Sequence, residues 1–315
     1  MAQSATNLRL IDNLKVNGYE PSDIRARVLE LLDNGDMKLK DIEKATSFKS
    51  STILQILHGK YDGDSRKALD SIASYYRYWL ARYKTVKTHS IEEIHAVIEL
   101  AWKRKEIAMV VGSFGKGKSE AALLYAVTHP DYAYFIELSG VSSTMELLTK
   151  IGEALDITDI MTGSASNRLA AIIRTLQRQP KLLIIDEADE LKPRSLKLLR
   201  DIRGDREERC AIVLIATEKL FRLLKDPQLG YFESRIAIKY RAHDVEFEEV
   251  VKIANKFPHK LDKLEIKTAW EWAKKHHSLR SFVLLFQRAY DMMQIKDLDE
   301  IDSDCIKEAY SWLID

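Results

Sequence analysis

The segment VVGSFGKGKSE carries the clearest chemical potential in this sequence. It places Gly112, Gly117, Lys118 and Ser119 in the spacing GxxxxGK[ST], with a further glycine at Gly115. Glycines let backbone N–H groups come close to phosphate oxygens, and the lysine brings a cation to the terminal phosphates of a nucleoside triphosphate. The serine hydroxyl is a ligand for Mg²⁺. The spacing therefore predicts a phosphate-binding P-loop.

The elements on both sides of this loop agree with that prediction. Ile107–Val111 is a continuous apolar run typical of a buried strand, and Ser119–Val127 has the composition of a helix. A strand, a glycine-rich loop and a helix in this order aim backbone N–H groups at a phosphate on the helix N-terminus.

A second group of candidate residues follows another apolar run. Leu182–Ile185 predicts a strand, and Asp186 and Glu187 come directly after it. Ligands of open α/β sheets bind at the carboxyl ends of the strands. Asp186 is predicted to hold Mg²⁺ through water, and Glu187 to orient or deprotonate an attacking water. An acidic pair can instead only cap a helix, but the intervening strand predicted at Tyr132–Glu137 favours catalysis.

The remaining periodicity predicts the rest of the fold. Ala211–Ala216 and Ile236–Tyr240 are further strand candidates, and helices are expected over Phe247–Lys256, Ile266–Lys275 and Ser278–Met293. Strands that alternate with helices indicate an α/β fold with a parallel sheet. The C-terminal helices indicate an all-helical lid after that core.

The N-terminal region reads differently, as short helices over residues 23–32, 39–45 and 51–59. The last two resemble a helix-turn-helix, with Ser50 or Ser51 as the N-cap and Gly59 as the stop. Candidate DNA contacts on this motif are Lys49, Ser51, Thr52, Gln55 and Lys60. The alternative is a helical bundle that serves only packing or protein contact.

One more amphipathic helix is predicted over residues 65–84, with Tyr75, Tyr76, Tyr78, Trp79 and Tyr83 near its end. These rings could stack on bases, but packing against neighbouring helices is favoured. We therefore expect three domains: a helix-turn-helix domain at 1–88, an α/β core at 89–242 and a helical lid at 243–315.

Two basic segments in the core are further candidates for contact with DNA phosphates. The first contains Lys103, Arg104 and Lys105 and no acidic residue; the second is a stripe at every third position, Arg194, Lys197, Arg200 and Arg203. Such surfaces bind phosphates without reading bases, so their affinity falls steeply with salt. A solvated face paired with acids such as Asp201 is an equal alternative for the stripe.

Composition limits the classes of protein. The chain has 315 residues, of which 46% are hydrophobic and 31% charged, with a formal net charge of +1. These values exclude wholesale disorder and a coiled-coil rod. No apolar run approaches the roughly 18 residues of a membrane helix, and no signal segment is visible. Two cysteines are too few for a disulfide framework. We expect a cytoplasmic protein that makes no use of a membrane.

Taken together, these motifs resemble the AAA+ ATPases. The resemblance implies that Thr217 is the first sensor, that Arg235 is an arginine finger reaching a neighbouring subunit, and that Arg280 is the second sensor in the lid. Over residues 25–312 the chain resembles one AAA+ family in particular, the phage Mu B-type ATPases that select targets in DNA transposition. The strings HGKYDGD, IIDEADEL, FESRIA and LRSF carry that likeness. Thr217 departs from the asparagine expected there, and Lys116 is an extra lysine in the P-loop.

That resemblance implies ATP and Mg²⁺ as cofactors, and double-stranded DNA, a transposase and further copies of the chain as partners. ATP would bind between protomers of a helical filament or ring on DNA, and hydrolysis would promote disassembly. Two alternatives remain. One is a helicase loader or replication initiator, which shares every ATPase motif and differs in its partner. The other is a nucleotide-switched regulator, which uses ATP for signalling without DNA filaments. ATP-driven polymerisation that depends on DNA length would favour the transposition ATPase. Recruitment of a hexameric helicase would favour the loader or initiator, and ATP binding by a monomer that ignores DNA would favour the regulator.

Overall fold

A computed structural model of the chain describes residues 21–35, 37–46, 48–64, 67–73, 75–76, 86, 88–138, 143–157, 163–204, 210–276 and 279–312. The chain folds as two compact units, Met1–Thr85 and Val86–Asp315, and each is described by itself. The division into three domains stays a prediction.

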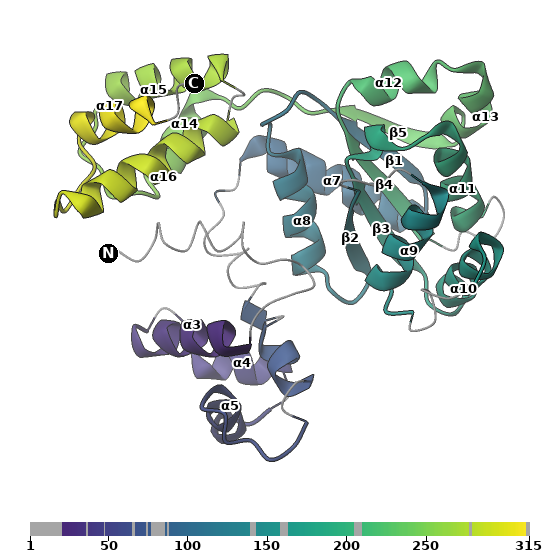
Figure 1. The fold of residues 1–315 in the computed structure, drawn as a ribbon, viewed down its shortest axis with the longest axis horizontal. Helices are drawn as coiled ribbons and strands as arrows, with labels where there is room; N and C mark the ends of the chain where they lie inside the picture. The colour runs from purple at the N-terminus through teal and green to yellow at the C-terminus, as the bar shows by residue number, and fades with distance from the viewer. Residues whose placement is uncertain are drawn as a thin grey trace. The chain divides into compact units, whose positions relative to one another are not determined.

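The first unit is helical over the residues that the structure describes. Its helices are α3 (Pro21–Asp33), α4 (Leu39–Thr46) and α5 (Ser50–Leu57), drawn in purple and dark blue in Figure 1. They form one core, which contains Ile24, Val28, Leu31, Met37, Ile42, Ile53, Ile56 and Leu57. Apolar residues three and four positions apart on each helix build this core, as the periodicity predicts.

The start of α5 differs from the sequence prediction. Its N-cap is Lys49, whose side chain makes no capping bond, and Ser50 is already inside the helix. The hydroxyl of Ser50 donates instead to Glu43 Oε2, at 2.5 Å, and so ties α5 to α4. The predicted stop is correct, because Gly59 adopts the left-handed conformation just after the helix, with φ 70°.

The predicted helix at 65–84 is described only in part. Residues 67–73 and 75–76 are helical. Tyr76 is fully buried and Tyr75 packs against the same core, so these two rings serve packing rather than base stacking. Tyr78, Trp79 and Tyr83 lie outside the described residues.

The second unit is built on a five-stranded, all-parallel sheet in the order β2-β3-β4-β1-β5. The strands are β1 (Ile107–Val111), β2 (Ala133–Glu137), β3 (Lys181–Asp186), β4 (Cys210–Ala216) and β5 (Ile236–Arg241). Each lies within one or two residues of a strand that the sequence predicts. The continuous apolar runs are explained by burial on both faces, since every residue of β1 and β4 is buried.

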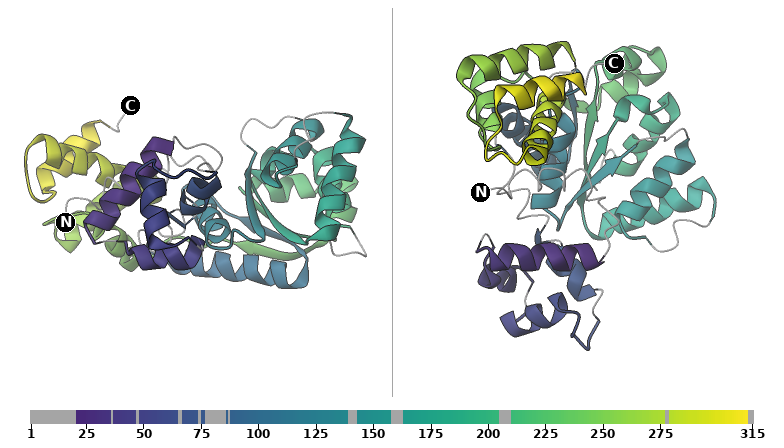
Figure 2. Two further views of the ribbon diagram at one scale, coloured as in Figure 1. Left: turned by 90° about the horizontal axis from the view of Figure 1, so that it is seen from below. Right: turned by 60° about the vertical axis from the view of Figure 1, so that its left-hand side comes forward.

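Helices cover both faces of this sheet (Figures 1 and 2). On one face lie α7 (His89–Arg104) and α8 (Lys118–Thr128), and on the other α9 (Thr144–Ala154), α10 (Ala165–Arg178) and α11 (Pro193–Arg203). Alternate strand residues face the second group, where Met109, Ile185 and Leu214 join its helices in one core. The short helices α12 (Lys219–Leu224) and α13 (Gly230–Glu233) connect β4 to β5.

Four helices follow the sheet: α14 (Phe247–Ala254), α15 (Lys263–Lys275), α16 (Leu279–Ile295) and α17 (Ser303–Ser311). They pack on one another around aromatic side chains, with the ring of Phe282 at 5.8 Å from Trp270 and 4.7 Å from Phe286. The predicted helical lid is therefore present as a helical region, with α17 as a helix that the sequence prediction missed.

Among the described residues, no helix combines the length and apolar character needed to cross a bilayer. Both cysteines, Cys210 and Cys305, are buried free thiols.

Candidate nucleotide site

The loop between β1 and α8 is shaped for close approach of a ligand. Gly115 and Gly117 have φ angles of 74° and 78°, where a side chain would be strained. A Cβ on Gly112 would lie 3.3 Å from the Cβ of Ala242, so space is also tight there. Gly117 is the N-cap of α8. The loop thus ends where backbone N–H groups point out of a helix start, which favours an anion.

Lys118 is held inside this loop. Its ammonium group donates to the carbonyl oxygens of Gly112, at 2.9 Å, and Ser113, at 2.8 Å, and the side chain is buried. Burial lowers the pKa of Lys118, while the negative charge of Asp186 opposes that shift. The cation is therefore already positioned at the loop, where phosphate oxygens would replace these carbonyl partners.

The acidic pair stands at the carboxyl end of β3, beside the P-loop. Asp186 is buried and accepts hydrogen bonds from the Glu187 N–H, at 2.9 Å, and from the Ser119 hydroxyl. Burial raises the pKa of Asp186, and these hydrogen bonds oppose the shift. Glu187 is exposed in a left-handed backbone conformation, with φ 57°. Partial desolvation of its carboxyl and the charge of Asp186 raise the pKa of Glu187 as well.

These oxygens suit Mg²⁺ bound together with phosphate. Within the described ranges no three His, Cys, Asp or Glu side chains form a group able to hold a metal ion by themselves. Mg²⁺ commonly takes only one or two carboxylates from a protein and completes its octahedron with waters and substrate phosphates. A buried carboxylate hydrogen-bonded to the Ser119 hydroxyl matches that pattern.

Thr217 follows β4 and faces the same edge of the sheet. Its N–H and hydroxyl donate to the two carboxylate oxygens of Asp189, at 3.1 and 2.6 Å. Because the hydroxyl proton is directed at Asp189, the oxygen of Thr217 is left as an acceptor. Asp189 was not singled out from the sequence, where it is only one of several acids after β3.

Glu137 is a second residue that the sequence reasoning missed. It ends β2 and lies directly opposite Asp186 in the parallel register. Its charge contributes to the raised pKa values of both Asp186 and Glu187. The rule that pointed to Asp186, a polar residue at the carboxyl end of a buried strand, applies equally to Glu137.

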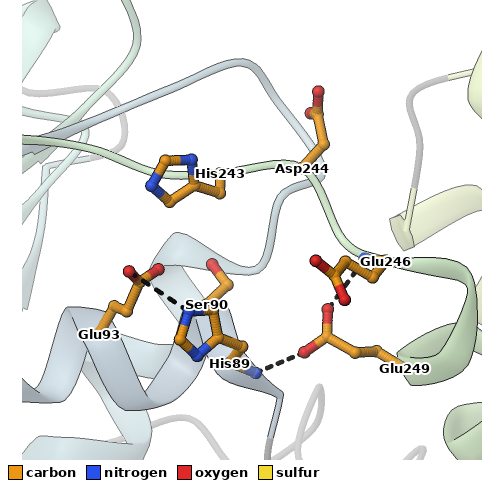
Figure 3. Close-up of a pocket in the computed structure, with 7 residues that line it drawn as sticks. All are labelled: His89, Ser90, Glu93, His243, Asp244, Glu246 and Glu249. Atoms are coloured by element: carbon orange, nitrogen blue, oxygen red, sulfur yellow. Dashed lines mark hydrogen bonds and ion pairs between the residues drawn. The ribbon is translucent and has the colours of Figure 1, made fainter.

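A cavity of about 370 Å³ lies close to the P-loop (Figure 3). It is lined by His89, Ser90, Glu93, His243, Asp244, Glu246 and Glu249. Asp244 pairs with Lys116 of the P-loop, at 3.0 Å, and Lys116 also donates to the carbonyl of Ala242, at 3.2 Å. Lys116, the extra lysine, therefore joins the cavity wall to the phosphate loop.

Two contacts connect the C-terminal helices to the core at this place. The buried carboxylate of Glu249 on α14 accepts from the N–H of His89 at the start of α7, and from its own N-cap Glu246, at 2.9 Å. Leu279 on α16 lies 3.9 Å from the position of a Cβ on Gly117. The next residue, Arg280, is exposed on the first turn of α16.

Arg235 does not belong to this cluster. It immediately precedes β5, which runs parallel to β1 with Ile236 opposite Ile107 and Arg241 opposite Val111. Arg235 thus lies at the amino edge of the sheet and the P-loop at the carboxyl edge, roughly 16 to 20 Å apart along the strands. Its guanidinium donates to the hydroxyl of Tyr231, at 2.5 Å.

The predicted DNA contacts fall into exposed and engaged groups. On α5 and its ends, Lys49, Ser51, Gln55 and Lys60 are exposed, and Thr52 is half-buried. In the core, Lys103 pairs with Glu99, and Lys105 lies over the ring of Trp102, where burial lowers its pKa. On α11, Arg194 is exposed and Lys197 half-buried, while Arg200 donates to Asp201 and Arg203 to the carbonyl of Lys105.

Comparison with known proteins agrees with this geometry. A family model described as an AAA domain matches residues 99–224. The ATP-dependent target DNA activator B of Escherichia phage Mu is 26% identical over 252 residues, which cover 74% of this chain and 77% of that protein. The DNA transposition protein B of the Mu-like prophage FluMu of Haemophilus influenzae is 29% identical over 144 residues, covering 44% and 48%.

Solved structures share the fold. The ORC1 protein of Aeropyrum pernix, solved in complex with DNA, superposes with a TM-score of 0.59 at 17% identity, covering 75% of this chain and 69% of that one. Cdc6p of Pyrobaculum aerophilum gives 0.60 at 12% identity, covering 75% and 70%. The fold, the nucleotide-site residues and these relatives together make the chain an AAA+ ATPase related to the B proteins of Mu-like phages.

Proposed function

We propose that the protein is an ATP-dependent DNA-binding ATPase that assembles on target DNA as a helical filament and recruits or stimulates a transposase. The position of Arg235 carries the assembly part of this proposal. An arginine at the opposite edge of the sheet cannot reach its own P-loop, yet it is suited to a P-loop of an adjacent copy. Arginine fingers supplied in trans stabilise the charge that develops on the transferred phosphoryl group.

The described side chains divide the chemistry among themselves. Lys118 and the loop N–H groups hold the phosphates, and Asp186 with Ser119 would hold Mg²⁺, which draws charge from the phosphate oxygens when bound. Glu187 accepts a proton from the attacking water, and its raised pKa makes it a better base near neutral pH. Thr217 donates its hydroxyl hydrogen bond to Asp189 and accepts one from the Lys219 N–H, and the remaining lone pair of its oxygen is proposed to accept a hydrogen bond from that water and orient it.

The cavity of Figure 3 is the proposed position of the nucleoside. It adjoins the phosphate loop through Lys116 and Asp244, its volume lies within the range of ligand pockets, and its polar and ionisable lining residues offer hydrogen-bond partners to a base and a sugar. Because Glu249 and Glu246 come from the start of α14, a nucleoside there would touch the first lid helix as well as the core. Arg280 is proposed to sense the phosphates from α16.

The DNA part of the proposal rests on the relatives and on exposed basic side chains. The Mu relative is named for activating target DNA, and the FluMu relative for DNA transposition. The exposed residues Lys49, Lys60 and Arg194 are the proposed phosphate contacts, together with the other predicted positions on α5 and with Lys197 on α11. They contain no feature that reads a particular base, so the binding is proposed to be non-specific.

Electron microscopy of the protein with duplex DNA and a non-hydrolysable ATP analogue tests this function. We expect regular helical assemblies whose length follows that of the DNA and which disappear when the nucleotide is omitted. A protein that stays monomeric, or forms closed rings whose size ignores DNA length, would contradict the proposal.

A further inference from the structure

Tyr231 lies against two arginines that come from different parts of the chain. The hydroxyl of Tyr231 accepts from Arg235, at 2.5 Å, and the guanidinium carbon of Arg235 is 4.8 Å from the centre of the tyrosine ring. The guanidinium carbon of Arg200, on α11, is 5.1 Å from the same ring centre. Both distances are within the roughly 6 Å over which a ring attracts a cation.

Packing of α13 against α11 and the core fixes the backbone that carries Tyr231. Tyr231 is the second residue of α13, and the helix contacts α11. The next residue, Phe232, is buried in the sheet core and anchors α13 beneath the tyrosine. Tyr231 itself is 50% exposed, so its ring stands at the surface with Arg235 beside it.

A finger that acts on another subunit benefits from being held before it is used. The arginine side chain has many rotamers, and ordering it on assembly costs free energy that reduces the gain from the contact. A ring face and a hydroxyl acceptor restrict Arg235 to few rotamers. Arg200, which also donates to Asp201 on its own helix, restricts the ring in turn.

We propose that Tyr231 is the positioning residue of Arg235, and that Arg200 steadies the tyrosine ring from α11. This inference rests on the proposed role of Arg235 as a finger in trans. Tyr231 acts through Arg235, so its loss lowers turnover in the neighbouring subunit and leaves nucleotide binding in its own subunit intact.

Turnover of the full chain at saturating ATP, high protein concentration and saturating duplex DNA gives the first test. We expect Tyr231→Ala to lower turnover roughly three- to tenfold, the size of one cation–π contact and one hydrogen bond. Tyr231→Phe keeps the ring and loses the hydroxyl acceptor, so its turnover should lie between those of wild type and Tyr231→Ala. The turnover of Arg200→Ala should also lie between these two. ATP affinity and DNA-dependent assembly should be unchanged, and a loss of either would overturn the proposal.

Two control variants separate positioning from general effects. Trp312→Ala removes another exposed ring, 64% accessible, at the C-cap of α17, and should leave turnover unchanged. Arg222→Ala removes an exposed arginine of α12 that lies outside the proposed catalytic and DNA-binding residues, and it should leave turnover unchanged. A defect at saturating DNA equal to that of Arg200→Ala would remove Arg200 from the proposed role.

Mixing subunits provides the decisive comparison. A Glu187→Gln protomer cannot hydrolyse ATP but carries an intact Tyr231 and Arg235, so it can serve an active neighbour. We expect it to restore turnover to Tyr231→Ala protomers and equally to Arg235→Ala protomers. If turnover is restored to Arg235→Ala protomers but not to Tyr231→Ala protomers, the role of Tyr231 is overturned and Arg235 remains a finger that acts in trans. Failure to restore Arg235→Ala would overturn the trans finger, and the inference about Tyr231 with it.

Discussion

The nucleotide site and the basic surfaces are organised in opposite ways. Around the P-loop, side chains from separate strands meet at one edge of the sheet and are held by partners: Lys118 by two carbonyls, Thr217 by Asp189, Asp186 by Ser119 and Glu187. The predicted DNA contacts are either exposed, as Arg194 is, or already engaged, as Arg203 is. Chemistry needs fixed geometry, whereas binding to a phosphate chain needs only charge that can reach it.

The largest effect is expected from the catalytic carboxylate. Glu187→Gln keeps the size and backbone of the residue but cannot accept a proton, so turnover should fall about 10² to 10⁴-fold while ATP still binds. Steady-state phosphate release and equilibrium ATP binding measure the two parts. Glu190→Gln is the matched control, since Glu190 pairs with Lys219 and should tolerate the change. Equal losses in both variants would remove Glu187 from the role of base.

The buried lysine should affect affinity rather than chemistry alone. Lys118→Ala removes a charge-assisted contact to the phosphates, and we expect ATP binding to weaken roughly 10- to 100-fold by calorimetry. Lys116→Ala provides the comparison within the same loop, because Lys116 is directed at Asp244 and Ala242 instead. If the two substitutions lower the affinity for ATP equally, Lys118 and Lys116 do not have the different roles that their contacts imply.

The buried carboxylate of Asp186 is expected to lower the free energy of unfolding of the nucleotide-free protein at neutral pH. Burial raises its pKa, so the folded protein binds a proton at Asp186 more tightly than the unfolded chain does, and its contribution to stability falls as pH rises above about 4. Asp186→Asn should therefore stabilise the nucleotide-free protein by ~0.5–2 kcal/mol at pH 7 and weaken Mg²⁺-dependent ATP binding. Thermal unfolding across pH checks this, and a gain that persists unchanged below pH 4 would contradict the cause given.

The smallest effects are expected on the basic surfaces. Arg194→Ala should reduce the slope of log affinity against log salt by about 1, as the loss of one phosphate contact does. Arg203→Ala should leave that slope unchanged, because the Arg203 guanidinium donates to the carbonyl of Lys105. Fluorescence anisotropy with labelled duplex DNA over a range of salt distinguishes them. A reversed order would mean that exposure in this structure does not identify the DNA surface.

The same contrast explains what could be predicted from the sequence. The five strands and the P-loop could be predicted because apolar runs and glycine spacing are local signals. Helices α9 and α10 lie outside the sequence prediction, although each places apolar residues three or four positions apart on its buried face. The prediction of Ser50 or Ser51 as the N-cap of α5 was wrong. The hydroxyl of Ser50 donates to Glu43 instead, and only the packing of α4 against α5 brings Glu43 near.

Within the site, the missing residues depend on the sheet order. Glu137 meets Asp186 because β2 and β3 are neighbours, although many residues separate them in the chain. Likewise, that Arg235 lies at the opposite edge from the P-loop follows from the parallel pairing of β5 with β1. The spacing of the motifs in the sequence specifies neither the pairing of Glu137 with Asp186 nor the edge on which Arg235 lies. The sequence therefore suggested an arginine finger in trans only through the resemblance to the family.

The central claim is that each active site is completed by an adjacent copy of the chain. The most direct measurement is ATP turnover per protomer over a wide range of protein concentration, with duplex DNA kept saturating. The account predicts that turnover per protomer rises steeply with concentration and then levels off once neighbours are in place. Turnover per protomer that is constant from the most dilute sample upward would contradict it.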